Sequence, residues 1–295
     1  MKTLSSVLMG LSLAVAACSF TAAQDTSSTS TIPKILQITI EYPKPYKGGA
    51  AHDKTESAFV LAQAKAKFPV YYVAMNSMSG RTRAIYMARY DSFAEWEKDN
   101  KMQDGNPTLS ADLERASIAD GELLDEVEQG VYTYDADLSY HPHDDIQNHR
   151  VYQISVFHVR PGHTKEWREV VKMVKDAHEK AGTSAHWGTY EVAFGAQDGT
   201  YIVLTGDSSM SAIDVGYSED KKFREAIGGA EGMQKLDELF GEAVDSSHSE
   251  LFTVNAKQSY VSADWIKSDP AFWKSNPAAS LASKPAPATK RASGQ

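Results

Sequence analysis

Three histidines and two aspartates lie within ten positions halfway along the chain, in the segment HPHDDIQNHR at residues 141–150. Imidazole nitrogens and carboxylate oxygens are the donors that bind zinc and related metal ions. His141 and His143 are only two positions apart, so they could share an ion only in an extended chain or with a third ligand from elsewhere. The segment has no regular zinc-type spacing, and Pro142 among Asp, Asn and His suits an exposed connection. We expect a linker at 141–150, with a metal site at His141 and His143 as the weaker alternative.

Other chemistry-bearing patterns are sparse. The sequence contains one cysteine, Cys18, and no G-x-S-x-G, H-E-x-x-H or glycine-rich phosphate motif, so it requires no cofactor. A carboxylate enclosed between two sheets could serve as a general base, and Glu191 lies in a strand-like segment. His186, beside Trp187, starts the same segment. Glu191 and His186 are therefore the weak catalytic candidates.

The elements that must position these residues occur twice. The segment LQITIEY (36–42) matches YQISVFH (152–158), RAIYMARYDSFAEW (83–96) matches TYIVLTGDSSMSAI (200–213), and VYTYDADLSY (131–140) matches LFTVNAKQSY (251–260). The offsets are 116, 117 and 120 residues, in the same order along the chain. Such constant spacing predicts a duplication, with repeats at 35–140 and 151–260.

Hydrophobic periodicity predicts the same element order in both repeats. The first repeat has strands at 35–42, 70–76, 83–90 and 130–136, with helical segments at 53–67 and 92–128. The second has strands at 151–159, 186–194, 200–205 and 250–256, with helical segments at 164–181 and 209–245, the latter broken by GGAEG. The order β-α-β-β-α-β is that of ferredoxin-like domains. The predicted fold class is α+β, with two tandem ferredoxin-like repeats.

The segment VYQISVFHVRPGHTKEWREVVKMVKDAHEKAG, which contains a V-x-P-G-x turn between strand and helix, resembles the dimeric α/β-barrel superfamily. NIPSNAP-like and antibiotic-biosynthesis-monooxygenase-like proteins belong to it, and the resemblance covers about residues 35–260. It implies an intrachain barrel in which one chain supplies both sheets. It also implies several functions, because the superfamily hosts monooxygenases, heme-handling proteins and plain binding modules. Heme is thus one cofactor option.

Strand alternation separates two sets of side chains. The apolar set includes Leu36, Ile38, Tyr152 and Ile154, and we expect it beneath the helices. We expect the polar and aromatic set to face between the sheets and to line a ligand cavity. Its members are Gln37, Thr39, Glu41, Gln153, Ser155, Phe157, Trp187, Thr189 and Glu191.

These observations leave three functions open. The first is an exported protein that binds a small molecule between two sheets. The second is a monooxygenase-like or heme-handling oxidoreductase of the superfamily that the chain resembles. The third is an assembly module without a ligand, and the sequence leaves the oligomeric state undetermined.

The two ends of the chain predict export. Residues 1–24 combine Lys2, the apolar run VLMGLSLAVAA and small residues, as in a signal peptide, and 25–34 should be a flexible segment. Cleavage near Ala23 and lipidation at Cys18, in the lipobox-like VAAC, are alternatives, both in a periplasmic or extracellular location. Residues 261–277 form a C-terminal extension, and the Ala-, Pro- and Ser-rich tail 278–295 should be disordered.

The charge of the chain argues against nucleic acid as a partner. The net charge is −9, and leaving out Lys2, Lys284, Lys290 and Arg291 near the ends lowers it to −13. An acidic body of this kind repels phosphate backbones. No other apolar run approaches the roughly 20 residues that a transmembrane helix needs.

Overall fold

The computed structural model describes residues 32–282 of the 295-residue chain. The predicted signal peptide, Cys18 and the tail from residue 283 onward lie outside the described residues, so export, cleavage, lipidation and tail disorder stay predictions. Within the described part, no helix is both long and apolar enough to cross a bilayer.

The two halves of the chain have the same order of elements. In the first half these are β1 (Ile35–Pro43), α1 (Ala50–Ala66), β2 (Tyr72–Ser77), β3 (Ala84–Tyr90), α2 (Phe93–Asp104), α3 (Pro107–Gly121) and β4 (Leu124–Tyr140). In the second they are β5 (Val151–Val159), α4 (Thr164–Ala181), β6 (Trp187–Phe194), β7 (Thr200–Asp207), α5 (Ser211–Ala226), α6 (Gly229–Ala243) and β8 (Val244–Val254). A single 3₁₀ turn, η1 (Ile146–Asn148), lies in the connection between them.

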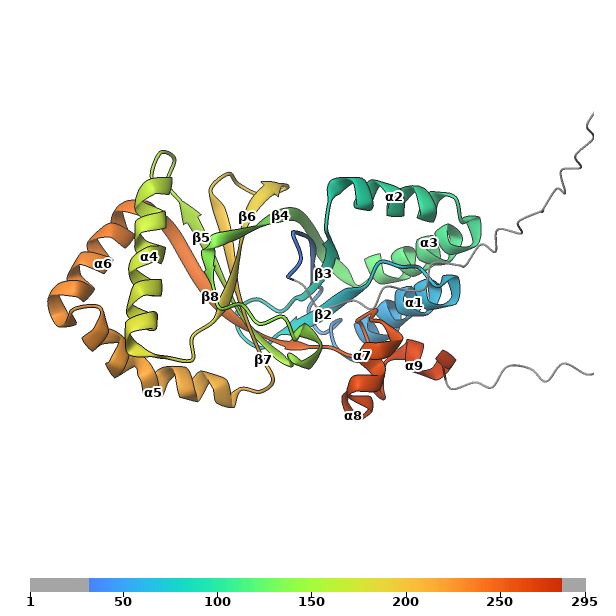
Figure 1. Ribbon diagram of the computed structural model, residues 1–295. Coiled ribbons are helices and arrows are strands. Elements are labelled where there is room, and N and C mark those ends of the chain that lie inside the picture. Colours follow the sequence, from blue (N-terminus) through green and yellow to red (C-terminus); the bar gives the residue numbers. More distant parts are fainter. Residues whose placement is uncertain (1–31, 283–295) are drawn as a thin grey trace, which may run out of the picture. The chain divides into compact units, whose positions relative to one another are not determined.

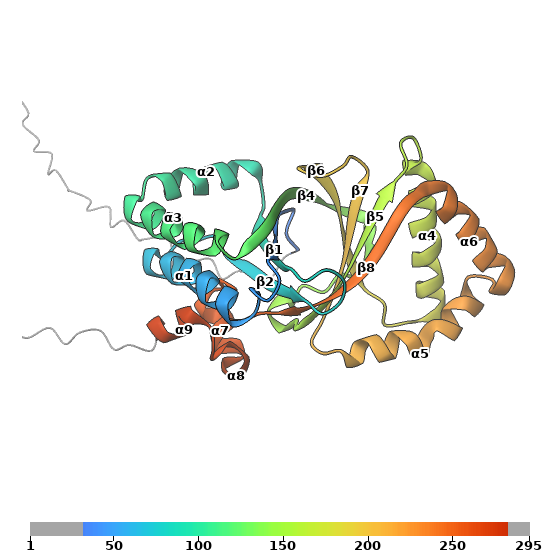
Figure 2. The ribbon, with the colours of Figure 1, turned by 180° about the vertical axis from the view of Figure 1, so that it is seen from behind.

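The eight strands form one closed barrel in the order β1-β3-β2-β8-β5-β7-β6-β4, and all neighbours are antiparallel. In each half the first strand lies between the third and the fourth. The pairs β2–β8 and β4–β6 join the halves, so each half completes the sheet of the other. Helices α1–α3 cover the first half, and α4–α6 cover the second on the opposite side of the barrel (Figures 1 and 2).

Strands β4 and β8 each begin six residues earlier than the sequence predicts, at Leu124 and Val244. The early part of β4 pairs with β1, where Val127 lies opposite Glu41. In the same way the early part of β8 pairs with β5, where Ser247 lies opposite Phe157. These ladder hydrogen bonds outweigh the helical preference of charged stretches such as LDEVEQ, which we read as helix.

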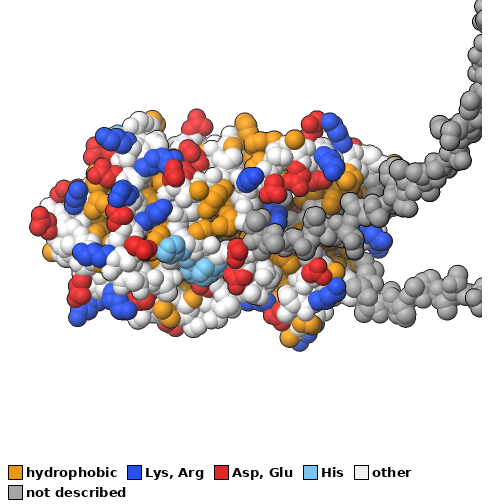
Figure 3. All heavy atoms as spheres, in the orientation of Figure 1, with side chains coloured by type: hydrophobic (Ala, Val, Ile, Leu, Met, Phe, Trp, Pro, Cys, Tyr) orange, Lys and Arg blue, Asp and Glu red, His pale blue; other side chains and the backbone are white. Residues whose placement is uncertain are grey.

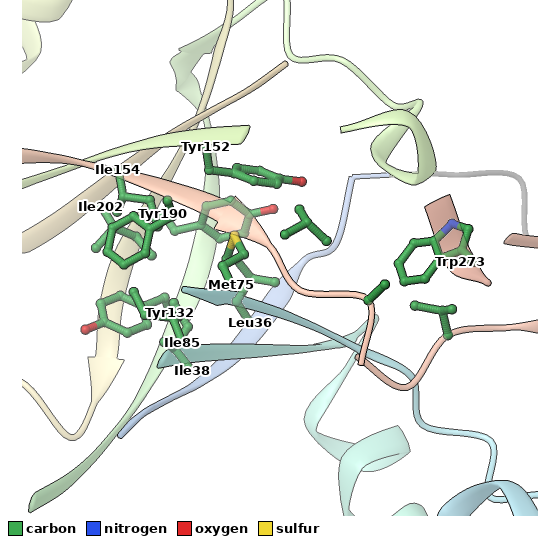
Figure 4. Close-up of a cluster of buried hydrophobic side chains, with 14 residues drawn as sticks. Leu36, Ile38, Met75, Ile85, Tyr132, Tyr152, Ile154, Tyr190, Ile202 and Trp273 are labelled. Atoms are coloured by element: carbon green, nitrogen blue, oxygen red, sulfur yellow. The ribbon is translucent and has the colours of Figure 1, made fainter. Parts of the chain in front are cut away.

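The interior of the barrel is apolar. Residues from both halves form one buried cluster, as Figure 4 shows for Leu36, Ile38, Tyr152 and Ile154, which lie among the strands with Met75 and Ile85. The expectation that this set lies beneath the helices, with a polar cavity between the sheets, is therefore wrong. Closing the sheet buries its concave face completely, so the more apolar set faces inward, and the polar set faces the helices.

The C-terminal extension packs on the first half. It forms α7 (Ala263–Ser268), α8 (Pro270–Trp273) and α9 (Pro277–Ala282), and Trp273 is only 1% exposed. Buried Asn276 fixes the start of α9: its amide donates to the carbonyls of Ala256 and Ser259, and its side-chain oxygen accepts from the N–H of Ala278. Residues 278–282, expected in a disordered tail, thus belong to a helix.

Candidate functional site in the first half

A pocket of about 350 Å³ lies between the outer face of the first-half sheet and helices α1 and α2. Strand β1 contributes three polar residues to its wall, Gln37, Thr39 and Glu41. The other lining residues come from α1, α2, β2, β3 and the segment before β2: Glu56, Phe59, Gln63, Phe68, Val70, Tyr72, Tyr86, Ala88, Tyr90, Trp96, Asp99, Asn100 and Gln103. None of these carries a positive charge.

A buried polar cluster forms one end of the pocket and extends behind it. His52 Nε2 lies 3.0 Å from Glu41 Oε2 and 3.5 Å from Asp120 Oδ1. Thr55 donates its hydroxyl hydrogen bond to the same Asp120 oxygen. His52, Glu56 and Asp120 are each at most 4% exposed. Three carboxyl groups and one imidazole are therefore held together away from bulk water.

Three elements meet to form this acid cluster, defined as Glu41, His52, Glu56 and Asp120. Glu41 is near the end of β1, and His52 and Glu56 are one turn apart on α1, so their side chains lie on the same face of that helix. Asp120 is in the last turn of α3. The carboxylate of Asp120 at the C-terminus of α3 opposes the helix dipole. The arrangement thus costs stability.

Glu56 has no hydrogen bond or ion pair among the described residues that meets normal geometry. Burial raises the pKa of the Glu56 carboxyl well above its usual range, and the neighbouring carboxylates Glu41 and Asp120 raise it further. The phenol of Tyr86 lowers this pKa slightly, yet its buried hydroxyl also lacks a hydrogen-bond partner in the described part of the chain. Burial likewise raises the pKa of Asp120. The cluster therefore favours holding a proton.

Helix α2 supplies an aromatic and polar wall opposite α1. Ser92 caps this helix by accepting a hydrogen bond from the N–H of Glu95, as is typical of a helix start. One turn further on, Trp96 stacks on Tyr90, with the ring centroids 5.3 Å apart. Burial raises the pKa of Tyr90 to about 12 and also raises that of Asp99. The pocket thus combines stacked rings with hydrogen-bonding groups that favour their neutral forms.

The positions of the second half that match the acid cluster hold apolar and aromatic residues. Glu41 and Phe157 occupy matched positions of β1 and β5, which pair with Val127 and Ser247 of β4 and β8. Asp120 and Phe240 each lie four residues before the strand that follows, which starts at Leu124 in one half and Val244 in the other.

The helix residues match in the same way. Helices α1 and α4 both end at a left-handed residue, Lys67 and Gly182. Counting back from these residues, His52 corresponds to Trp167, and Glu56 to Val171. The acid cluster is thus replaced by a packed apolar set, Phe157, Trp167, Val171 and Phe240.

The remaining predicted ligand residues of the second half have protein partners or pack in its core. Tyr201 donates to Glu191 at 2.9 Å, Trp187 and Thr189 both donate to the Leu138 carbonyl, and Ser155 bonds to Ser249. Phe157 packs on Trp167, and Gln153 lies in β5 outside the lining of the first-half pocket. Of the predicted set, only Gln37, Thr39 and Glu41 line the pocket, and their binding role stays a prediction.

The two catalytic candidates of the sequence analysis, Glu191 and His186, lie in the second half, outside this pocket. Both ring nitrogens of His186 face backbone carbonyls, of Ser184 and Gly206. His52, Glu56 and Asp120 escaped the sequence analysis. The signal that could have found His52 and Glu56 is HDKTE at 52–56, which places two ionisable residues one turn apart at the start of a helix.

Heme does not fit this pocket. Tyrosine is the only residue type in the lining that ligates heme iron, and burial raises the pKa of Tyr86 and of Tyr90, which opposes the phenolate form. The ionisable acids in the lining, Glu41, Glu56 and Asp99, would repel the propionates of a heme, and no Lys or Arg offsets them. We derive no chemistry through heme.

Metal-binding geometry occurs in three groups of described residues, in each of which one donor atom per residue lies within 4.8 Å of the others. One is the acid cluster itself, in which burial and the neighbouring carboxylates raise the pKa of Glu56. The others are His143, Asp145 and His149, and His163, Glu166 and Glu242. His141 stacks on Tyr140, with centroids 4.1 Å apart, and belongs to none of these three groups, so an ion shared by His141 and His143 stays a prediction.

No protein-family model and no curated protein matches the sequence. Solved structures do match. An anthrone oxidase-like protein aligns with a TM-score of 0.51 and 10% identity, over 79% of this chain and 96% of that one. The fold is that of a dimeric α/β-barrel. A monooxygenase-like protein from Fusobacterium nucleatum aligns with a TM-score of 0.48 and 11% identity, over 75% and 91% of the two chains. A chlorite dismutase-like protein gives 0.44 and 10%, over 77% and 97%.

These identities show a shared fold and nothing of activity. The NIPSNAP-like and antibiotic-biosynthesis-monooxygenase-like labels, and the duplication itself, stay predictions.

Proposed function

We propose that the first-half pocket binds a small, neutral, partly aromatic molecule and that the acid cluster exchanges a proton with it. The observation that carries this proposal is the difference between the halves. The same positions hold buried carboxyls beside an open pocket in one half and packed aromatic rings in the other. A fold that can fill this space with Phe and Trp does not need three buried acids there.

The pocket wall indicates the chemistry of the ligand. A volume of about 350 Å³ lies at the lower end of the roughly 300–1,000 Å³ range of small-molecule sites. The stacked Tyr90–Trp96 pair suits a flat ring. A protonated Glu56 and the unpaired Tyr86 hydroxyl can both donate hydrogen bonds, so the ligand should carry a carbonyl or hydroxyl oxygen. A carboxylate or phosphate ligand would meet acidic residues and no Lys or Arg in the pocket lining, so anions should bind poorly.

Occupancy of the pocket can be tested by blocking it. Ala88 lines the pocket from β3, so Ala88→Trp should fill the space while leaving the acid cluster intact. A panel of neutral phenols and aromatic ketones, with benzoates as the anionic counterparts, is screened by thermal shift and calorimetry. We expect the neutral compounds to bind the native protein and to lose at least tenfold in affinity for Ala88→Trp. Unchanged affinity in a folded Ala88→Trp would place the binding elsewhere.

Proton exchange has a separate readout. Calorimetry of the best ligand in two buffers of different ionisation enthalpy reports the protons taken up or released on binding. We expect a net proton change in the native protein and none in Glu56→Gln, which keeps the shape of the side chain but cannot titrate. The titration is repeated after treatment with a chelator, so that a bound cation is distinguished from a proton. An equal proton change in both proteins would contradict the role of Glu56.

A catalytic extension of this proposal is proton abstraction from an aromatic ketone. It draws on the buried, proton-holding acid cluster and on the name of the anthrone oxidase-like protein that shares the fold. In this step the ionised form of Glu56 accepts the proton next to the carbonyl, and the resulting carboxyl group exchanges that proton with solvent and returns a deuteron to the same carbon. We expect the native protein to accelerate exchange of solvent deuterium into anthrone, followed by NMR, and Glu56→Gln to slow this by about 10²–10⁴-fold. No acceleration by the native protein would leave binding as the function.

A further inference from the structure

A second group of potential ligands lies far from the pocket in sequence, in the connection between β4 and β5. His143, Asp145 and His149 each offer a donor atom, and these atoms lie within 4.8 Å of one another. Their spacing along the chain is H-x-D-x₃-H. The turn η1 brings them together, because it folds residues 145–149 back so that the N–H of His149 donates to the Ile146 carbonyl. On the face shown in Figure 3, histidine side chains gather at one place.

His149 is oriented as a metal ligand would be. It is 6% exposed, and its Nδ1 lies 3.0 Å from the buried hydroxyl of Tyr152. Its other nitrogen, Nε2, is buried and has no hydrogen-bond partner in the described part of the chain. Metal-bound histidines almost always use one nitrogen for the ion and donate the other N–H to a neighbour. Without an ion, an unpaired buried nitrogen is costly.

The carboxylate of Asp145 is positioned in the same manner. Its Oδ2 accepts a hydrogen bond from the Asn148 amide, which leaves Oδ1 facing His149 Nε2 at 3.4 Å. These two atoms are close but do not form a hydrogen bond of good geometry. A separation of about 3–3.5 Å is what two donors have around one ion that binds each at about 2.0–2.2 Å.

His143 completes the group from the solvent side. It is exposed, and its ring stacks on His186 with the centroids 3.7 Å apart. Because the nitrogens of His186 face backbone carbonyls, His186 supports His143 and is not itself a ligand. Two imidazoles and one carboxylate suit Zn²⁺, Cu²⁺ or Ni²⁺, whereas Ca²⁺ and Mg²⁺ prefer oxygen ligands.

We propose that His143, Asp145 and His149 bind one transition-metal ion of the zinc type, with a fourth position open to water. Tyr152 and Asn148 are positioning residues that orient His149 and Asp145. The ion would tie the exposed connection to the barrel where the two halves join. The inference is independent of the first-half pocket.

The test is competition for Zn²⁺ between the full chain and a chromogenic chelator. We expect binding by the native protein, at least tenfold weaker binding by His143→Ala and Asp145→Asn, and unchanged binding by His141→Ala, the neighbouring exposed histidine. Tyr152→Phe should weaken binding by about 10–100-fold. Glu56→Gln should bind Zn²⁺ like the native protein, and excess Mg²⁺ should not displace the ion.

Because His143 is exposed, its removal should not disturb folding, which circular dichroism verifies. The proposal is overturned if the native protein does not bind Zn²⁺, if His143→Ala binds it equally well, or if His141→Ala weakens binding as much as His143→Ala does.

Discussion

The helix-covered face of the sheet is built differently in the two halves of this protein. In the second half Phe157, Trp167 and Phe240 pack together at the matched positions. In the first half the matched positions hold Glu41, His52 and Asp120 beside an open pocket. Elements in the same order thus enclose packed aromatic rings in one half and buried ionisable groups, which are costly to desolvate, in the other. The costly half is where function should be sought.

Features that both halves share mark what the fold itself requires. Ser259 accepts a hydrogen bond from the N–H of Ala74, and Ser139 accepts one from the N–H of Thr189, at the same 2.9 Å. Tyr260 pairs with Tyr72, and Tyr140 with Trp187. These matched contacts join the second strand of each half to residues at or just after the last strand of the other half. The repeated tyrosines are therefore a structural clasp.

The largest effect is expected from moving an acid into the second half. Val171 is 8% exposed within the apolar cluster, so Val171→Glu buries a carboxyl without a polar partner. A shift of about three pKa units for such a group corresponds to about 4 kcal/mol of lost stability. Urea unfolding at pH 7 measures this loss. A cost below about 1 kcal/mol would mean that the second half tolerates buried acids as well as the first.

The reciprocal change should stabilise the protein. Glu56→Val places the second-half residue type at the matched first-half position and removes a desolvated carboxyl next to Glu41 and Asp120. We expect a gain of about 0.5–2 kcal/mol in the free energy of unfolding, together with loss of ligand binding. If Glu56→Val is clearly less stable than the native protein, Glu56 is part of the packing and not a functional cost.

The pH dependence of stability provides a finer comparison. Because the pKa of Glu56 is raised in the folded protein, the folded state holds this proton more tightly than the unfolded state. The resulting stabilisation is complete below about pH 4, where the unfolded chain is also protonated, and is lost as pH rises toward the folded pKa. Asp120 acts in the same direction. Glu56→Gln should therefore gain stability relative to the native protein as pH rises above about 4.

Chemical denaturation at several pH values measures this difference in the free energy of unfolding between the native protein and Glu56→Gln. Parallel curves for the native protein and Glu56→Gln would show that Glu56 titrates normally in the folded state.

The smallest expected effect is the difference in stability between variants of the two clasp tyrosines, Tyr260 and Tyr140. Tyr260 donates to the Phe68 carbonyl at 2.7 Å in a buried position, whereas Tyr140 donates to Glu179, whose side chain is 70% exposed. Tyr260→Phe should cost about 1–2 kcal/mol and Tyr140→Phe about 0.5 kcal/mol, since water can replace only the second hydrogen bond. Thermal unfolding of the two variants side by side measures this. The reverse order would show that Glu179 contributes more than its exposure suggests.

The order of elements could be predicted from the sequence because periodicity and turn residues are local. The helix Thr164–Ala181 and the strand Val151–Val159 begin and end as predicted. Alternation also separated the two faces of each strand. It could not show which face points inward, because both faces of this sheet are covered, one by the opposite side of the barrel and one by helices.

Part of the site could be predicted from the sequence because strand alternation is a local pattern. Gln37, Thr39 and Glu41 share one face of a strand, and the structure places them together on the pocket wall. Asp120 joins His52 only through tertiary packing of α3 against α1, which no local pattern encodes. The predicted helix also began at residue 53, so His52 fell outside it.

The most direct test of the central claim uses a pair of matched glutamines. Gln37 lines the first-half pocket, and Gln153 occupies the same position in the second half, where the region beneath the helices is filled. Calorimetry with a neutral phenol or aromatic ketone compares Gln37→Ala with Gln153→Ala. Our account predicts about tenfold weaker binding for Gln37→Ala and native affinity for Gln153→Ala. Equal affinities for the two variants, or a loss confined to Gln153→Ala, would contradict it.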